Sequence, residues 1–180
     1  MSVTTIPTAG IADTAISTAK IADDAVTAAK VTGLGKIAQV VTAQPITSNF
    51  ATSSSSYVDV TNLNASITPS ATSSKILVHC YVQLYTAGSV QGPVARMQLV
   101  RGSTAINGFQ ASTYDQGGNG VQTNNTATIS VLDSPSSSSS VTYKVQLKNT
   151  AGSSATVQAE ATDGGGGQST PTFVLMEVLA

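Results

Sequence analysis

An apolar residue recurs every five positions along the first 31 residues, and this step limits what the segment can fold into. The ladder consists of Ile6, Ile11, Ile16, Ile21, Val26 and Val31. A step of five matches neither the period of an α-helix, about 3.6 residues, nor that of a strand, about 2. A continuous helix would rotate successive ladder residues by about 140° and scatter them around its surface. The segment is therefore not one long amphipathic helix.

The same segment repeats itself, because IADTAISTAK is followed directly by IADDAVTAAK. Asp13 and Asp23 stand where helix N-caps are favoured. Lys20 and Lys30 follow at the ends of the two repeats, where a positive charge suits the helix dipole. The repeat predicts short helical turns joined by extended Ile-Ala links.

Such an arm offers too few apolar side chains to build a core of its own. Each copy supplies one Ile or Val every five residues and mostly Ala between them. Several copies wrapped about an axis would pool these residues into a thin stack. We therefore expect residues 11–36 to form an oligomeric shaft, the alternative being a disordered tail rich in Ala and Thr.

From residue 37 onward the chain consists of short runs rich in Val, Ile, Thr and Tyr, separated by clusters of Ser, Gly, Pro and Asn. Hydrophobic residues make up 41% of the chain, which favours a folded core although only 9% of residues are charged. This pattern predicts an all-β head at 37–180 with about eight to ten strands. The runs are IAQVVTAQ, YVDVTNLNASIT, KILVHCYVQLY, VARMQLVRG, TATISVLD, VTYKVQLKN, ATVQAEA and TFVLMEVL.

Three runs differ in how their two faces are composed. VTYKVQLK alternates cleanly between apolar and polar residues, which predicts a sheet with one face in water. KILVHCYVQLY and TFVLMEVL are largely apolar or aromatic on both faces. One face of each belongs to the core, and we expect Cys80 there as a buried, inert thiol.

The second face needs a cover, and the simplest cover is another copy of the chain. We therefore expect a subunit interface at His79, Tyr81, Tyr85, Val174 and Met176. A loop folded over this face is the alternative.

Charge and residue counts exclude several classes of protein. A net charge of −1 gives no footprint for nucleic acid or an anionic membrane. The chain has no apolar run of the roughly 18 residues that a transmembrane helix needs, and its start lacks the pattern of a signal peptide. The single cysteine forms no internal disulfide, and the single histidine, His79, cannot build a multi-histidine zinc site within one chain.

We expect no enzyme and no cofactor. The nine carboxylates stand in no recognisable catalytic pair, and no serine lies in a GxSxG context.

Two Gly-rich and amide-rich segments, 114–125 and 161–170, are candidates for recognising a glycan. Amides supply paired donors and acceptors for sugar hydroxyls, and an aromatic ring can stack on a sugar. The alternative is ordinary solvent-exposed connections between strands. The candidate residues are Phe109, Tyr114, Asp115, Asn119, Asn124 and Asp163.

The chain also resembles a known class of protein. The decapeptide repeats are similar to the shaft repeats of bacteriophage tail-fibre and head-fibre proteins. SSKILV, RGSTAI, LDSP…VTYKVQ and the ending TFVLMEVL resemble a head domain found at the end of short phage fibres. The resemblance implies a homotrimer whose head is a jelly roll of the tumour-necrosis-factor and C1q type. Strand count alone also permits an immunoglobulin-like sandwich.

The resemblance further implies a structural role at the surface of a phage particle. Residues 1–10 would anchor the fibre on a capsid or tail protein, residues 11–36 would form the shaft, and the head would point outward as a candidate for host attachment. Two alternatives stay open: a glycan-binding adhesin of the tail, and a polysaccharide depolymerase. Head fibre and tail fibre are not distinguished.

Overall fold

The computed structural model describes residues 36–42, 48–88, 94–112, 121–150, 155–159 and 171–179. These residues form ten strands and no helix, so the prediction of an all-β fold is confirmed. No helix that could cross a membrane is found in this part of the chain. The predicted anchor and shaft, residues 1–10 and 11–36, lie outside the described residues except for Lys36, so both stay predictions.

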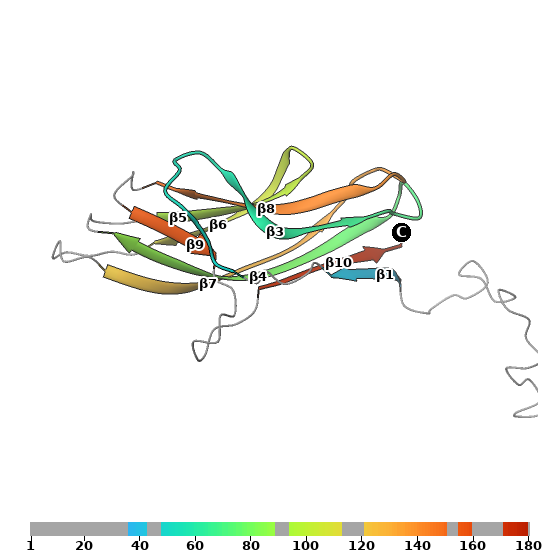
Figure 1. Cartoon of the computed structure of the whole chain (residues 1–180). Helices are drawn as coiled ribbons and strands as arrows, with labels where there is room; N and C mark the ends of the chain where they lie inside the picture. Colours follow the sequence, from blue (N-terminus) through green and yellow to red (C-terminus); the bar gives the residue numbers. More distant parts are fainter. Residues whose placement is uncertain are drawn as a thin grey trace, which may run out of the picture. The chain divides into compact units, whose positions relative to one another are not determined.

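The strands form two antiparallel sheets that face each other (Figure 1). Sheet A contains β1 (Ile37–Thr42), β2 (Phe50–Thr52), β4 (Lys75–Gly88), β7 (Val121–Asp133), β9 (Ala155–Ala159) and β10 (Thr172–Val178). Sheet B contains β3 (Val58–Ile67), β5 (Val94–Arg101), β6 (Thr104–Ser112) and β8 (Val141–Asn149).

The strands pair in a nested order. β1 pairs with β10, β2 with β9, β3 with β8, β4 with β7 and β5 with β6, all antiparallel. When a series of nested antiparallel strand pairs folds over on itself, its strands are distributed over two opposed sheets. This is the connectivity of a jelly roll rather than of an immunoglobulin-like sandwich.

The core lies between the sheets and is built by the alternate residues of each strand that point inward. On β4 the side chains of Ile76, Val78, Cys80, Val82 and Leu84 are all fully buried. Sheet B contributes buried side chains from β3, β5 and β8, of which the largest are Leu63, Ile67, Met97, Leu99, Tyr143 and Leu147. The predicted burial of Cys80 is confirmed, and burial raises the pKa of its thiol to about 12, which keeps it unreactive.

β8 follows the alternation that its sequence predicts. Tyr143, Val145 and Leu147 are fully buried, whereas Thr142 on the other face is exposed. Glu177 of β10 is the one charged side chain among the buried residues that the structure describes, because it shares the inward face with Phe173 and Leu175 and is itself fully buried.

Three strand positions differ from the expectation. Residues 48–56 (SNFATSSSS), expected as a Ser-rich separator between strands, contain β2, and β6 (TAINGFQAS) is not among the runs predicted as strands. The segment 114–125 was expected to be a loop, but residues 121–125 belong to β7. Polar and small residues form strands here because pairing with β9, β5 and β4 satisfies their backbone groups, which local propensity does not register.

Candidate functional site

The five residues predicted to form a subunit interface share one surface of the molecule. His79, Tyr81 and Tyr85 alternate with the core residues of β4, and Val174 and Met176 alternate with those of β10. Val174 is paired directly with His79. All five side chains are half-buried in the single chain and lie on the outer face of sheet A. The structure thus brings these residues together on one face.

Large apolar side chains complete this face, which we call the apolar face. Register aligns Val40, Met176, Leu77 and Leu132 into one row across β1, β10, β4 and β7. Ile37 and Val178 form the next pair in the same direction. Among the described residues the large hydrophobic side chains that are exposed are Ile37 at 47%, Val40 at 56% and Leu132 at 49%, and all three lie here. A gathering of this kind is typical of an interaction surface.

The outer face of sheet B, which we call the polar face, has the opposite character. Asp59 accepts hydrogen bonds from Lys144 Nζ at 2.8 Å and from Gln146 Nε2 at 2.6 Å. Gln98 Nε2 in turn donates to Gln146 Oε1 at 2.6 Å. The interactions with Lys144 and Gln146 lower the pKa of Asp59. This face therefore needs no protein cover.

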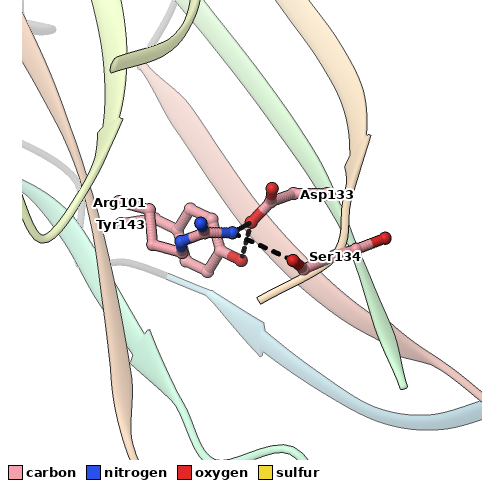
Figure 2. A network of polar contacts seen from close by, with 4 residues as sticks. All are labelled: Arg101, Asp133, Ser134 and Tyr143. Atoms are coloured by element: carbon pink, nitrogen blue, oxygen red, sulfur yellow. Dashed lines mark hydrogen bonds and ion pairs between the residues drawn. The ribbon is translucent and has the colours of Figure 1, made fainter. Parts of the chain in front are cut away.

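The two sheets are also joined by a polar network at one end of β7 (Figure 2). Asp133 Oδ2 accepts hydrogen bonds from Arg101 Nη1 and Tyr143 Oη, both at 2.6 Å. Arg101 also reaches the carbonyl oxygen of Ser134 at 3.3 Å. Since Asp133 belongs to sheet A and its two partners to β5 and β8 of sheet B, the network ties the sheets together.

Each of the three residues in this network comes from one of the motifs that resemble the phage head domain. Arg101 comes from RGSTAI, Asp133 from LDSP and Tyr143 from VTYKVQ. Gly102, at φ 58°, begins the tight turn between β5 and β6 that leaves Arg101 at the end of its strand. Burial and the hydrogen bond to Asp133 raise the pKa of Tyr143, so its hydroxyl stays protonated and donates. We interpret the motifs as structural rather than catalytic.

Glu177 is held in the interior by donors from the connection between β3 and β4 and from strand β1. Its Oε1 accepts hydrogen bonds from Ser70 N at 2.7 Å and Ser70 Oγ at 2.6 Å, and its Oε2 accepts one from Gln39 Nε2 at 2.7 Å. Burial alone would raise the pKa of Glu177, but these bonds to the charged form lower it to about 2. The Ser74 hydroxyl is buried without a hydrogen bond of good geometry, yet it is close enough to contribute to this lowering.

The lowered pKa predicts that the free energy of unfolding falls in acid. Unfolded, Glu177 titrates near 4.5, above its folded pKa of about 2. Its contribution is therefore complete above about pH 5 and is lost as the pH falls from 4.5 to 2. We expect a loss of about 1–3 kcal/mol from this group. Urea titrations of the wild type and Glu177→Gln across this range measure it, and equal pH dependence in the two proteins would contradict the assignment.

The structure describes only two of the residues predicted as candidates for glycan binding. Phe109 on β6 is half-buried and packs against the core, and the backbone of Asn124 on β7 pairs with Tyr85. The other glycan candidates, Tyr114, Asp115, Asn119 and Asp163, lie outside the described residues, as do all six ladder residues. Within the described ranges no group of His, Cys, Asp and Glu side chains is arranged to hold a metal ion.

Comparisons with known proteins give low similarities. No family model and no curated protein matches the chain. Among solved structures, dimeric latent PorU from Porphyromonas gingivalis aligns over 73% of this chain and 12% of its own, with a TM-score of 0.34 and 9% identity. The structure of infectious bursal disease virus, Gx strain, aligns over 78% of this chain and 42% of its own, with a TM-score of 0.34 and 14% identity.

A third solved structure is the infectious bursal disease virus VP2 subviral particle. It aligns over 79% of this chain and 37% of its own, with a TM-score of 0.32 and 16% identity. The chain thus spans less than half the length of each of these three proteins. Similarities at this level assign neither a family nor an activity.

Proposed function

We propose that this chain is a structural protein of a phage particle, a short homotrimeric fibre that is attached by its N-terminus and carries an outward jelly-roll head. The observation that carries the proposal is the contrast between the two outer faces of the sandwich. The apolar face exposes Ile37, Val40 and Leu132, whereas on the polar face hydrogen bonds link the side chains of Asp59, Gln98 and Gln146. A protein with one such face is suited to packing against copies of itself.

Two independent features of the sequence support the same assembly. The step of five in residues 6–31 needs several copies to bury its Ile and Val residues. The decapeptide repeats and the head motifs resemble those of phage fibres. This resemblance is the basis for proposing three copies per assembly and a position on a phage particle. The proposal covers both a head fibre and a tail fibre.

The described carboxylates favour a passive role over a polysaccharide depolymerase. Glycoside hydrolysis requires a general acid whose pKa is raised. The pKa values of Asp59 and Glu177 are instead lowered by hydrogen bonds, and Asp133 is engaged by Arg101 and Tyr143. Incubating the full chain with host polysaccharide tests the alternative, because turnover would establish an enzyme.

The shaft is tested by placing charge on the ladder. In the double variant Ile16→Asp, Ile21→Asp, like charges would meet near the axis, where unpaired charge is costly to bury. We expect light scattering after size exclusion to show a weakened trimer, or limited proteolysis to leave a shorter resistant fragment.

The matched control moves the same two charges one residue along the chain, as Ser17→Asp with Ala22→Asp. If the ladder variant kept the wild-type trimer and fragment, the axial role of the ladder would be refuted. If the control lost the trimer equally, added charge rather than the ladder position would be responsible.

A further inference from the structure

One row of side chains crosses β8, β5 and β6 of sheet B on the polar face, and two of its members carry unbalanced positive charge. Lys148 of β8 stands directly opposite Arg96 of β5, and Arg96 stands opposite Gln110 of β6. Tyr57 precedes β3 at the other end of the row, with Lys148 Nζ 4.5 Å from the centre of its ring. We call these four residues the basic row.

Like charges directly opposite each other on neighbouring strands destabilise a sheet. The contact with the Tyr57 ring is favourable for Lys148. The exposed guanidinium of Arg96, however, has no carboxylate partner among the described residues. Their three carboxylates are engaged elsewhere: Asp59 by Lys144, Asp133 by Arg101 and Glu177 by Gln39 and Ser70. The basic row therefore keeps an unfavourable pair that an external anion would relieve.

In the neighbouring row the polar side chains are paired, so the unbalanced positive charge is confined to the basic row. Asp59, Gln146, Gln98 and Gly108 lie side by side in register, and the first three are linked by hydrogen bonds. Lys144 on the same face has its acid partner at 2.8 Å. A polar face that pairs one lysine with an acid and leaves Arg96 opposite Lys148 resembles a binding surface more than a uniformly solvated one.

A hollow lies beside the basic row. It has a volume of about 200 Å³, is open to solvent, and is bordered by Tyr57, Arg96, Met97, Gly108, Phe109 and Gln110. Gly108 creates room because it contributes no side chain next to Gln98, and a Cβ there would meet only the Met97 carbonyl oxygen at 3.4 Å. The hollow is smaller than the roughly 300–1,000 Å³ of pockets that enclose a drug-sized ligand, so it suits one unit of an extended chain.

We propose that the basic row and this hollow bind one carboxylated sugar unit of an acidic polysaccharide. The forked guanidinium of Arg96 matches a carboxylate, with Lys148 adding a second positive charge. The Gln110 amide offers a donor and an acceptor to sugar hydroxyls, and the ring of Tyr57 provides an apolar edge. Aromatic and amide groups beside the cations favour a sugar acid over a free phosphate. The site lies on the opposite side of the sandwich from the apolar face, which is the face proposed for contacts within the trimer.

The experiment titrates the full chain with trigalacturonic acid, with its uncharged methyl ester and with inorganic tripolyphosphate, using NMR or calorimetry. We expect the acid to bind, to weaken as salt is raised, and to bind at least about tenfold more tightly than the ester. No binding of the acid at 10 mM (about the weakest affinity of interest), equal binding of the ester, or tighter binding of tripolyphosphate would overturn the proposal.

Variants locate the site. Arg96→Gln removes the fork, and Gly108→Val fills the hollow at an exposed strand position, so each is expected to weaken binding of the acid at least about tenfold. Lys75→Gln, an exposed cation on sheet A, changes the net charge equally and is expected to leave binding unchanged. A loss of binding in Lys75→Gln as large as in Arg96→Gln would mean that net charge alone is responsible and would refute the site. Circular dichroism confirms folding of each variant, and either site variant suffices if the other misfolds.

Discussion

Asp133→Ala is expected to lower the free energy of unfolding by about 2–4 kcal/mol, because it leaves two donors without their shared acceptor. The Tyr143 ring is fully buried, and the side chains of Arg101 and Asp133 are 24% and 11% exposed. Figure 2 shows both donors converging on one carboxylate oxygen. The loss falls below the largest values for buried ion pairs, because solvent reaches part of Arg101. Urea unfolding at a fixed protein concentration measures it.

Two control variants separate burial from charge. Asp59→Ala also removes a carboxylate bonded to a cation, Lys144, but Asp59 is 53% exposed, so a change of about 0–1 kcal/mol is expected. Asp133→Asn keeps an acceptor for Tyr143 and is expected to lie between the two alanine variants. Equal losses in Asp133→Ala and Asp59→Ala would mean that the network does not hold the sheets together.

The sequence predicts the sandwich because its runs have the composition and length of strands. In VTYKVQLK apolar and polar residues alternate without interruption, so its inward set, Tyr143, Val145 and Leu147, follows from the residues alone. The apolar second face of β4 is predicted in the same way, because Leu77, His79 and Tyr81 are visible in the sequence. The shaft, the trimer and the loop candidates remain predictions.

The sequence pattern does not predict arrangements that depend on the pairing of strands far apart in the chain. In the sequence, Glu177 is a charged residue within the apolar run TFVLMEVL. Its burial cannot be predicted there, because its donors Gln39 and Ser70 are more than 100 residues away in the chain. The basic row is hidden for the same reason: Tyr57, Arg96 and Lys148 lie in three separate runs and meet only through the pairing of β3, β8 and β5. Strand β6 was missed because Asn107 and Gly108 are poor strand formers whose backbone groups are satisfied by β5.

Leu77→Glu is expected to raise the dissociation constant of the proposed trimer by at least about 100-fold, which corresponds to about 3 kcal/mol. Leu77 lies in the middle of the apolar face, paired with Met176 on one side and Leu132 on the other. Its side chain points away from the core and is half-buried in a single chain, so a glutamate there is compatible with the monomer fold. Between copies it would bring like charges into a desolvated contact. Analytical ultracentrifugation over a dilution series measures the change.

The control is Asn64→Glu, which adds the same charge on the polar face, at an exposed position opposite Lys144. It is expected to leave both the assembly and the stability unchanged within about 0.5 kcal/mol. Since the shaft is proposed to contribute to assembly as well, Leu77→Glu need not abolish the trimer at high concentration, and the dissociation constant is the decisive quantity. An unchanged constant would mean that the heads do not pack through sheet A. A folded monomer of Leu77→Glu beside a trimeric Asn64→Glu would instead locate the contact on the apolar face, because the two variants differ only in which sheet carries the charge.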